Sequence, residues 1–289
     1  MPQQPTMQDI HAQLPERAPG FIVSDIDGTF LDANHRVSRR TREVIRRATD
    51  SGAQFALATG RPFRWVVGVI EQLNVRPVCV TSNGAVLYDT AADKVLEAHT
   101  LDPSVQKDIY YTAQEVLLRH GGAKLACELP GTSAYDVHEK QFIAEESYSE
   151  TPGLDGFTMM PTDDVLAQPS VKLLLRNLTM TAPEMYQLVA PHIDPQQAHV
   201  TYSMNDGLLE FAAPGVTKAL GVAQLAGQYG VAQSDVITFG DMPNDIEMLT
   251  WSGTGVAMGN AADAVKKAAD LVTLPNTQGG VATVLERWF

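Results

Sequence analysis

The segment 21–32 constrains this chain more than any other feature. An apolar run of β-branched and aromatic residues delivers two carboxylates, Asp25 and Asp27, and then breaks at Gly28 and Thr29. Because side chains two positions apart on a strand point the same way, both carboxylates can lie at its C-terminal tip, where open α/β sheets place their ligands. Like charges so close repel each other unless a cation or a proton neutralises them. The oxygen ligands favour a hard divalent cation; a simple acidic turn is the alternative for this segment alone.

Three later stretches carry the same kind of signal. Residues 56–61 form a second apolar run that ends in a hydroxyl, a glycine and a cation. Residues 214–218 place one lysine at the start of a predicted helix, and residues 237–245 form a further apolar strand that ends in a second acidic cluster. Two shorter segments, 82–85 and 255–261, are rich in small and amide side chains.

Taken in this order, the four stretches resemble the four signature motifs of the haloacid dehalogenase superfamily. The two shorter segments narrow the resemblance to its Cof-like branch, and it covers nearly everything from about Phe21 to the C-terminus. The resemblance implies a Mg²⁺-dependent phosphoric monoester hydrolase that acts on small phosphorylated metabolites, sugar phosphates first. It also implies a large cap domain inserted between the second and third motifs.

Strand and helix signals alternate at both ends of the chain. Helices are expected at about 38–50, 62–73, 218–229, 245–250 and 262–269, with a final one reaching 288; strands are expected at 54–58, 77–81, 236–239, 255–258 and 271–274. Strands that alternate with helices imply parallel strands joined by crossovers. The predicted fold class is α/β, a doubly wound parallel sheet with a Rossmann-like core.

The middle of the chain has a different pattern. Helices are expected at about 105–119 and 183–189, and strands at 124–128, 134–137, 171–176, 199–204 and 208–212. The last two strands are joined by Asn205-Asp206-Gly207, a hairpin signal that does not belong in an all-parallel sheet. We therefore predict an inserted α+β cap domain at 86–213, a catalytic core at 21–85 and 214–289, and a flexible N-terminal extension at 1–20.

The resemblance assigns chemistry to the acidic residues. Asp25 matches the nucleophile, which forms an aspartyl phosphate, and Asp27 matches the general acid/base. Dehalogenase members lack the second aspartate, so its presence favours phosphoryl transfer. Asp241 matches the metal-binding acid, and it would hold Mg²⁺ together with the Asp25 carboxylate and the backbone carbonyl of Asp27. Asp245 would orient either Lys218 or a metal-bound water.

Phosphate ligands are expected at the other motifs. Thr59 and the amide of Gly60 stand where a hydroxyl and an N–H can bind the transferring group at a helix N-terminus. Lys218 would neutralise negative charge as a point cation, and Asn244 would hydrogen-bond the phosphate.

Three further residues are candidates for substrate contact. Arg61 could touch the substrate or brace its own loop. Asn83 and Gly84 could touch it or could simply form a turn before the inserted domain.

The overall composition limits which classes of molecule the protein can be expected to bind. A net charge of −13 argues against nucleic acid, but not against a small phosphorylated molecule, because a metal and buried cations can reverse the charge locally. No run approaches the ~20 apolar residues of a membrane span, and residues 1–20 lack the pattern of a secretory signal, so a cytoplasmic protein is expected. Cys79 and Cys127 lie in apolar runs and are expected to fill the core. The oligomeric state is left open.

Two alternatives remain beside the phosphatase. A phosphomutase of the phosphomannomutase type shares the motifs, but it usually carries several cap arginines, and only Arg119 and Arg176 occur within 86–213. A non-catalytic binding module on the same fold would be favoured by loss of a motif residue, and none is lost.

Overall fold

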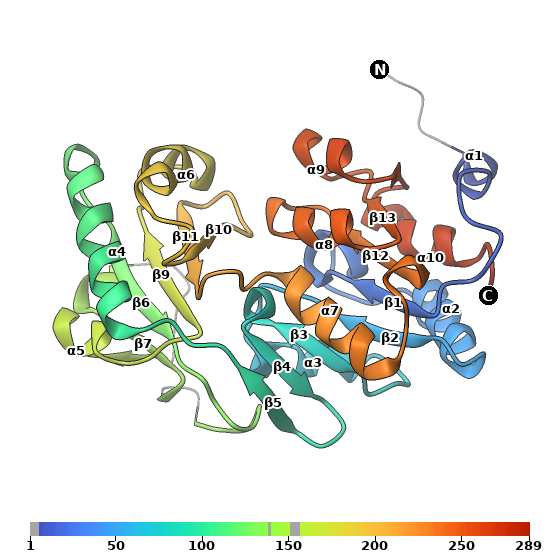
Figure 1. Ribbon diagram of the computed structural model, residues 1–289, viewed down its shortest axis with the longest axis horizontal. Coiled ribbons are helices and arrows are strands. Elements are labelled where there is room, and N and C mark those ends of the chain that lie inside the picture. The colour runs from blue at the N-terminus through green and yellow to red at the C-terminus, as the bar shows by residue number, and fades with distance from the viewer. Residues whose placement is uncertain (1–5, 138–139, 151–156) are drawn as a thin grey trace. The chain divides into compact units, whose positions relative to one another are not determined.

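The computed structural model describes residues 6–137, 140–150 and 157–289 (Figure 1). The chain divides into two compact units, Met1–Asp93 with Lys218–Phe289, and Lys94–Thr217. The second unit begins at Lys94 instead of Val86 because strand β4, Val86–Asp89, pairs with the preceding strand β3, Val78–Thr81, inside the first unit.

A parallel sheet forms the centre of the first unit. Its strand order is β14-β13-β12-β1-β2, and every neighbouring pair is parallel. The strands are β1 Phe21–Ser24, β2 Gln54–Leu57, β12 Val236–Gly240, β13 Thr254–Ala257 and β14 Leu271–Val272. The α/β fold class is confirmed.

Burial on both faces explains why the middle strands are continuously apolar. Every residue of β1 and of β12 is buried. Helices cover the sheet, and Figure 1 shows α7 and α8 on one side of it and α2 and α10 on the other. The helices of this unit are α2 Arg39–Asp50, α3 Val67–Ile70, α7 Lys218–Tyr229, α8 Ile246–Trp251, α9 Asp263–Ala268 and α10 Gly280–Leu285.

Two elements of the first unit differ from the sequence-based prediction. The predicted strand 77–81 exists as β3, but it pairs antiparallel with β4 and is joined to the central sheet by an isolated parallel bridge, Ala58 with Val80. The predicted helix 62–73 is a 3₁₀ turn at Phe63–Trp65 followed by the single turn α3. The run Val66-Val67-Gly68-Val69 explains the short helix, because β-branched residues and glycine are poor helix formers.

The prediction of a flexible N-terminal extension is wrong for residues 6–20. Helix α1, Met7–His11, is capped by Thr6, and its Ile10 is fully buried. His11 Nε2 lies 2.6 Å from the carbonyl of Thr283 in α10, and Trp288 donates to the carbonyl of Pro15 at 3.0 Å. The segment is therefore packed against the C-terminal end of the first unit.

The second unit is an α+β domain. Its six-stranded sheet has the order β10-β11-β9-β6-β7-β8 and is antiparallel except for the pair β7 and β8. The strands of the unit are β5 Lys94–Ala98, β6 Lys124–Glu128, β7 Phe142–Ala144, β8 Thr158–Met159, β9 Lys172–Arg176, β10 His199–Thr201 and β11 Leu208–Ala212.

One strand of this unit was predicted at the wrong place. Residues 134–137 form a turn, because the Asp136 carboxylate accepts hydrogen bonds from the backbone N–H groups of Thr132 and Ser133 at 2.8 and 3.0 Å. The strand that pairs with β6 beyond this turn is β7.

Helices pack on one face of the second sheet. They are α4 Pro103–Val116, α5 Thr162–Leu166 and α6 Ala182–Val189. Their apolar residues, such as Ile109 and Met185, form one core with Leu173 and Leu175 of β9 (Figure 1). Lys172 and Leu174 alternate with these residues and therefore lie on the opposite face.

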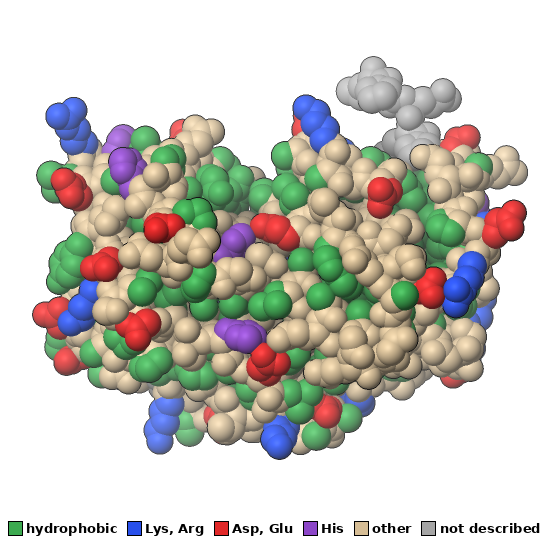
Figure 2. All heavy atoms as spheres, viewed as in Figure 1, with side chains coloured by type: hydrophobic (Ala, Val, Ile, Leu, Met, Phe, Trp, Pro, Cys, Tyr) green, Lys and Arg blue, Asp and Glu red, His purple; other side chains and the backbone are tan. Residues whose placement is uncertain are grey.

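None of the helices in the described part of the chain has the length and apolar content that crossing a membrane requires. On the face shown in Figure 2, acidic and basic side chains of the described residues are interspersed. The two cysteines are free and buried, and burial raises the pKa of each thiol to about 12, as expected for core-filling residues.

Candidate active site

Three neighbouring strands of the first unit end in polar side chains. Asp25 follows β1, Thr59 follows β2 and Asp241 follows β12. Strands β12, β1 and β2 are adjacent and parallel, so their carboxyl ends meet at one edge of the sheet. The Asp25 N–H donates to the carbonyl of Phe239 at 2.9 Å, which continues the β1–β12 ladder to the aspartate itself.

A buried acidic cluster lies at this edge. Carboxylate oxygens of Asp25, Asp241 and Asp245 all lie within 4.8 Å of one another. Lys218, the first residue of α7, is 1% exposed, and its Nζ donates to Asp25 Oδ1 and to Asp245 Oδ1, each at 2.7 Å. Asp245 also accepts the backbone N–H groups of Asp241 and Met242 through Oδ2 at 2.9 and 3.0 Å. Both oxygens of Asp245 are therefore occupied in orienting Lys218 and the loop after β12.

Burial and crowding shift the pKa values of these groups. Burial raises the pKa of Asp25 well above its usual range; Lys218 opposes the shift, and Asp245 and Asp241 reinforce it. Burial, followed by the charge of Asp245, raises the pKa of Asp241 to about 7. Burial alone would lower the pKa of Lys218, but Asp245 and Asp25 outweigh it, so this pKa lies above its usual value.

The cluster has the charge and the ligand chemistry for a divalent cation. One ammonium faces three buried carboxylates, which leaves an excess of negative charge when all are ionised. Oxygen ligands suit Mg²⁺. Asp25 and Asp241 would hold the ion. Both oxygens of Asp245 are already hydrogen-bonded, so Asp245 orients Lys218 and does not bind the ion directly.

Two residues that the sequence analysis did not assign hold Asp241. Thr29 Oγ1 donates to Asp241 Oδ1 at 2.9 Å, and Asn260 Nδ2 approaches Asp241 Oδ2 at 3.3 Å and the carbonyl of Gly28 at 2.8 Å. Gly28 has φ 76°, and a Cβ at this position would lie 2.2 Å from Asp241 Oδ2. Glycine is required by the backbone conformation and by the close approach. The available signal was that Thr29 and Asn260 both lie in motifs already noted.

Asp27 stands apart from the buried carboxylates. Its side chain is 48% exposed and accepts a bidentate pair of hydrogen bonds from Arg61, Nε to Oδ2 at 2.6 Å and Nη2 to Oδ1 at 2.5 Å. Bidentate guanidinium–carboxylate pairs fix both distance and orientation. Arg61 was expected either to touch the substrate or to brace its own loop. In the structure it connects the loop after β2 to the loop after β1 through Asp27.

The remaining predicted phosphate ligands surround the same edge. Thr59 is buried; its N–H donates to the carbonyl of Val80 at 2.8 Å, and its Oγ1 accepts the Arg61 N–H at 3.1 Å. Asn244 is buried one turn after Asp241, and its Nδ2 donates to Asn83 Oδ1 at 3.0 Å. Gly60 lies between Thr59 and Arg61, and Gly84 ends the turn that begins at Ser82. All the predicted site residues thus belong to the loops of the first unit or to the start of α7.

Comparison with known proteins identifies the family. The sequence model that describes haloacid dehalogenase-like hydrolases matches residues 22–285. The chain belongs to this family. The predicted superfamily and its Cof-like branch are therefore confirmed.

Relatives of this haloacid dehalogenase-like hydrolase match more than nine-tenths of its length. A 5-amino-6-(5-phospho-D-ribitylamino)uracil phosphatase of Bacillus subtilis is 27% identical, covering 95% of this chain and 99% of its own. Phosphatase YwpJ of the same organism is 27% identical, covering 92% and 98%. A solved haloacid dehalogenase-like hydrolase from Bacteroides thetaiotaomicron has a TM-score of 0.69 at 27% identity and covers 94% of this chain and 100% of its own.

The relatives also give the class of reaction. Like them, this haloacid dehalogenase-like hydrolase is a phosphatase, a phosphoric monoester hydrolase, as predicted. Its buried aspartate cluster can hold a metal ion.

Proposed function

We propose that this protein is a Mg²⁺-dependent phosphatase that hydrolyses small phosphorylated metabolites, sugar phosphates above all, through an aspartyl-phosphate intermediate on Asp25. The single observation that carries the proposal is the bridge that buried Lys218 makes between Asp25 and Asp245 beside Asp241. This arrangement provides a nucleophile, a fixed cation and a place for a divalent ion in one buried cluster.

Asp25 has the geometry of a nucleophile. Its Oδ1 is engaged by Lys218, and Oδ2 makes no hydrogen bond among the described residues. We assign attack on phosphorus to Oδ2. The bond to the leaving-group oxygen breaks as the aspartyl phosphate forms, and water then releases inorganic phosphate and restores the carboxylate. Bound Mg²⁺ would screen the negative charges that otherwise keep a carboxylate and a phosphate dianion apart.

Asp27 is the proposed general acid/base. It follows the nucleophile by two residues, and its partly exposed carboxylate is open to a leaving group and to water. The bidentate contact with Arg61 orients the carboxylate, and one of its two hydrogen bonds must open for Asp27 to carry and deliver a proton. Asp27 would protonate the leaving oxygen and later take the proton of the attacking water.

The phosphoryl oxygens would be bound by Thr59, the amide of Gly60, Lys218 and Asn244. Each of these groups supplies an N–H or O–H donor or a positive charge, which a transferring phosphoryl group requires. In this assignment Lys218 serves both Asp25 and the substrate.

The substrate class is inferred from the relatives and from charge. The uracil phosphatase of Bacillus subtilis is named for a substrate with a phosphorylated ribityl chain. A net charge of −13 disfavours polyanionic macromolecules and permits small phosphate esters where a bound metal ion together with Lys218 would reverse the local charge. We propose that the second unit, Lys94–Thr217, is the cap that selects the leaving group.

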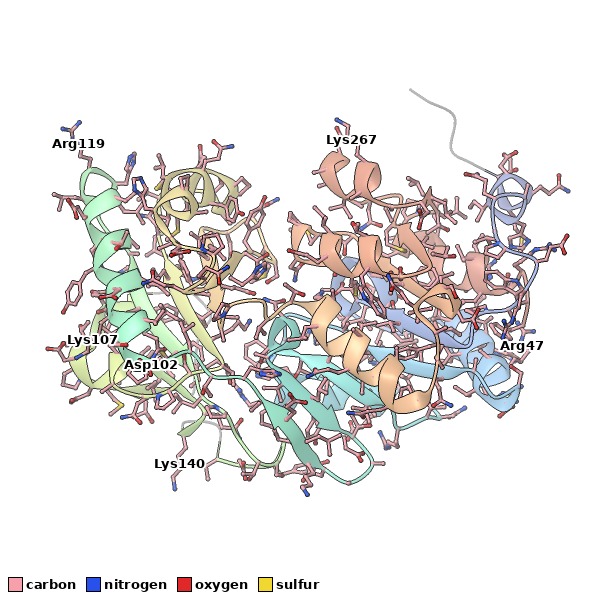
Figure 3. The ribbon with its side chains drawn as sticks, in the orientation of Figure 1. Arg47, Asp102, Lys107, Arg119, Lys140 and Lys267 are labelled. Carbon is pink, nitrogen blue, oxygen red and sulfur yellow. The ribbon has the colours of Figure 1, made fainter. Side chains whose placement is uncertain are left out.

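The phosphomutase alternative is disfavoured by the arginines of the second unit. Arg119 is exposed in the 3₁₀ turn Leu118–His120 that follows α4, and it projects away from the ribbon in Figure 3. Arg176 is engaged with the Asp206 carboxylate at 2.9 Å. Neither side chain matches the group of arginines that a mutase uses to hold a sugar phosphate in two orientations.

A panel of phosphate esters tests the proposed function. We expect phosphate release from sugar phosphates with Mg²⁺, slower release from nucleotides and cofactor phosphates, and none after chelation. Full activity after exhaustive chelation would contradict the metal dependence. Interconversion of sugar phosphate isomers without phosphate release would favour the mutase, and tight binding with no turnover would favour a binding module.

Thermal stability should report the metal site independently of activity. The pKa of Asp241 rises from 3.8 to about 7 on folding, so the metal-free folded state retains a proton that the unfolded state loses between these values. The metal-free protein therefore loses stability as the pH rises from about 4 to about 7. Mg²⁺ binds the ionised carboxylate, so its stabilising effect should be larger at about pH 8 than at about pH 5.5. The measurement is Tm with Mg²⁺ and with a chelator at both pH values.

The matched control for this measurement is Asp241→Asn, which removes the titrating carboxyl and keeps its size. In this variant the Mg²⁺-dependent rise in Tm should be small at both pH values. An equal rise in Tm for the wild type and the variant would show that Mg²⁺ binds elsewhere.

A further inference from the structure

The turn after β3 has an unusual backbone. Ser82, Asn83 and Gly84 have φ values of 50°, 58° and 97°, so three consecutive residues occupy the left-handed region. Two of them are not glycine, and such a conformation persists only where the surrounding contacts determine it. All three residues are buried. An observed backbone outlier of this kind beside an active site calls for a functional explanation.

The turn is fastened to the loop after β2 by its backbone. The Ser82 N–H donates to the carbonyl of Arg61 at 2.9 Å, and the Asn83 N–H donates to the carbonyl of Thr59 at 3.0 Å. These bonds place the Asn83 side chain beside the proposed phosphate-binding loop. In this left-handed turn, Asn83 contacts both the loop after β2 and the loop after β12.

The side chain of Asn83 reaches the loop after β12. Its Oδ1 accepts a hydrogen bond from Asn244 Nδ2 at 3.0 Å, and both residues are buried. An amide group can be turned by half a revolution with little change of shape, and only its hydrogen bonds decide which end is the donor. In the structure Asn83 presents Oδ1, which can only accept, and Asn244 presents its NH₂ group to it.

Asn244 has groups left for a ligand. Nδ2 carries two hydrogens and makes one hydrogen bond to the described residues, and Oδ1 is buried without a partner among them. We propose that Asn83 is a positioning residue: its side-chain oxygen holds the Asn244 carboxamide so that the second N–H of Nδ2 is available to a phosphoryl oxygen. This inference rests on the proposed function, in which Asn244 binds the phosphate.

Inorganic phosphate, used as a competitive inhibitor, tests the role of Asn83. Asn83→Gly keeps the left-handed backbone and removes the side chain. We expect it to raise the inhibition constant of phosphate and the KM by about tenfold, with a smaller change in kcat, because the lost interaction binds ground state and transition state alike. Ser82→Gly is the matched control: glycine suits the same backbone, and the Ser82 hydroxyl has no hydrogen-bond partner among the described residues, so phosphate inhibition should be unchanged.

A double-mutant cycle separates the possible outcomes. If Asn83 acts through Asn244, then Asn83→Gly should have no further effect on phosphate inhibition in an Asn244→Ala background. Full additivity, or an unchanged inhibition constant in Asn83→Gly alone, would overturn the positioning role. An unchanged inhibition constant in Asn244→Ala would instead overturn the phosphate-binding role on which the inference rests.

A second pair of variants distinguishes positioning from a merely structural role. Asn83→Ala removes the same polar side chain but leaves a Cβ, and a residue with a Cβ is strained at φ 58°. The Tm of Asn83→Ala should therefore lie below that of Asn83→Gly. Positioning predicts equal losses of phosphate affinity in both variants despite the difference in Tm. A loss of affinity that follows the loss of Tm would overturn the proposal.

Discussion

Replacement of Asp25 by asparagine should abolish turnover, with a loss of about 10⁴-fold or more, because the reaction loses its nucleophile. Asparagine has nearly the same size, and its Oδ1 can still accept from Lys218, as Asp25 Oδ1 does at 2.7 Å. The variant also removes one of three crowded buried carboxylates. The Tm of the metal-free variant should therefore not fall, and the loss of activity can be attributed to chemistry instead of folding.

The comparison with Asp27→Asn tests the division of labour between the two acids. Loss of a general acid/base typically costs ~10²–10⁴-fold. An aryl phosphate with a weakly basic leaving group needs little protonation, so Asp27→Asn should still form the phosphoenzyme and hydrolyse it slowly. Acid quench and mass spectrometry should detect a phosphorylated Asp25 in this variant and none in Asp25→Asn. A phosphoenzyme trapped on Asp25→Asn would show that the nucleophile is misassigned.

The strand ends of the site could be predicted because their signal is local. The runs 21–24 and 236–239 are continuously apolar, each is followed at once by an aspartate, and parallel strands deliver their ends to one edge. The hairpin signal at 205–207 likewise identified the change to an antiparallel sheet in the second unit. In each case a few consecutive residues carry the whole pattern.

The side-chain partners of Arg61 and Asn83 could not be predicted, because these contacts depend on turn geometry across distant segments. Arg61 meets Asp27 across 34 positions of sequence, and Asn244 meets Asn83 across 161. Each pairing requires a particular backbone conformation, such as the left-handed turn at 82–84. The packing of residues 6–20 was missed for a related reason: Ile10 and Leu14 are isolated apolar residues in a polar segment, and their burial is a property of the surface they cover.

Lys218 gives the second prediction with a large effect. Lys218→Met removes a buried ammonium from between Asp25 and Asp245, and removing one partner of a buried ion pair typically costs about 3–5 kcal/mol. The loss should be largest at about pH 8 without metal, where the carboxylates must ionise without their cation. It should shrink towards about pH 5, because protonation removes the uncompensated charge. Urea unfolding in the presence of a chelator at both pH values measures the loss.

The double variant Lys218→Met/Asp245→Asn separates stability from catalysis. Removing one carboxylate together with the ammonium restores the charge balance in part, so much of the lost unfolding free energy should return. Activity should not return, because Lys218 also neutralises the nucleophile and the phosphoryl group in the proposed reaction. Recovery of both would show that Lys218 serves only to stabilise the fold. If neither stability nor activity returns, the unpaired Asp245 carboxylate is not what destabilises Lys218→Met. The lost free energy of unfolding would then come from the unpaired Asp25, and the Lys218–Asp245 bridge would contribute little to the fold.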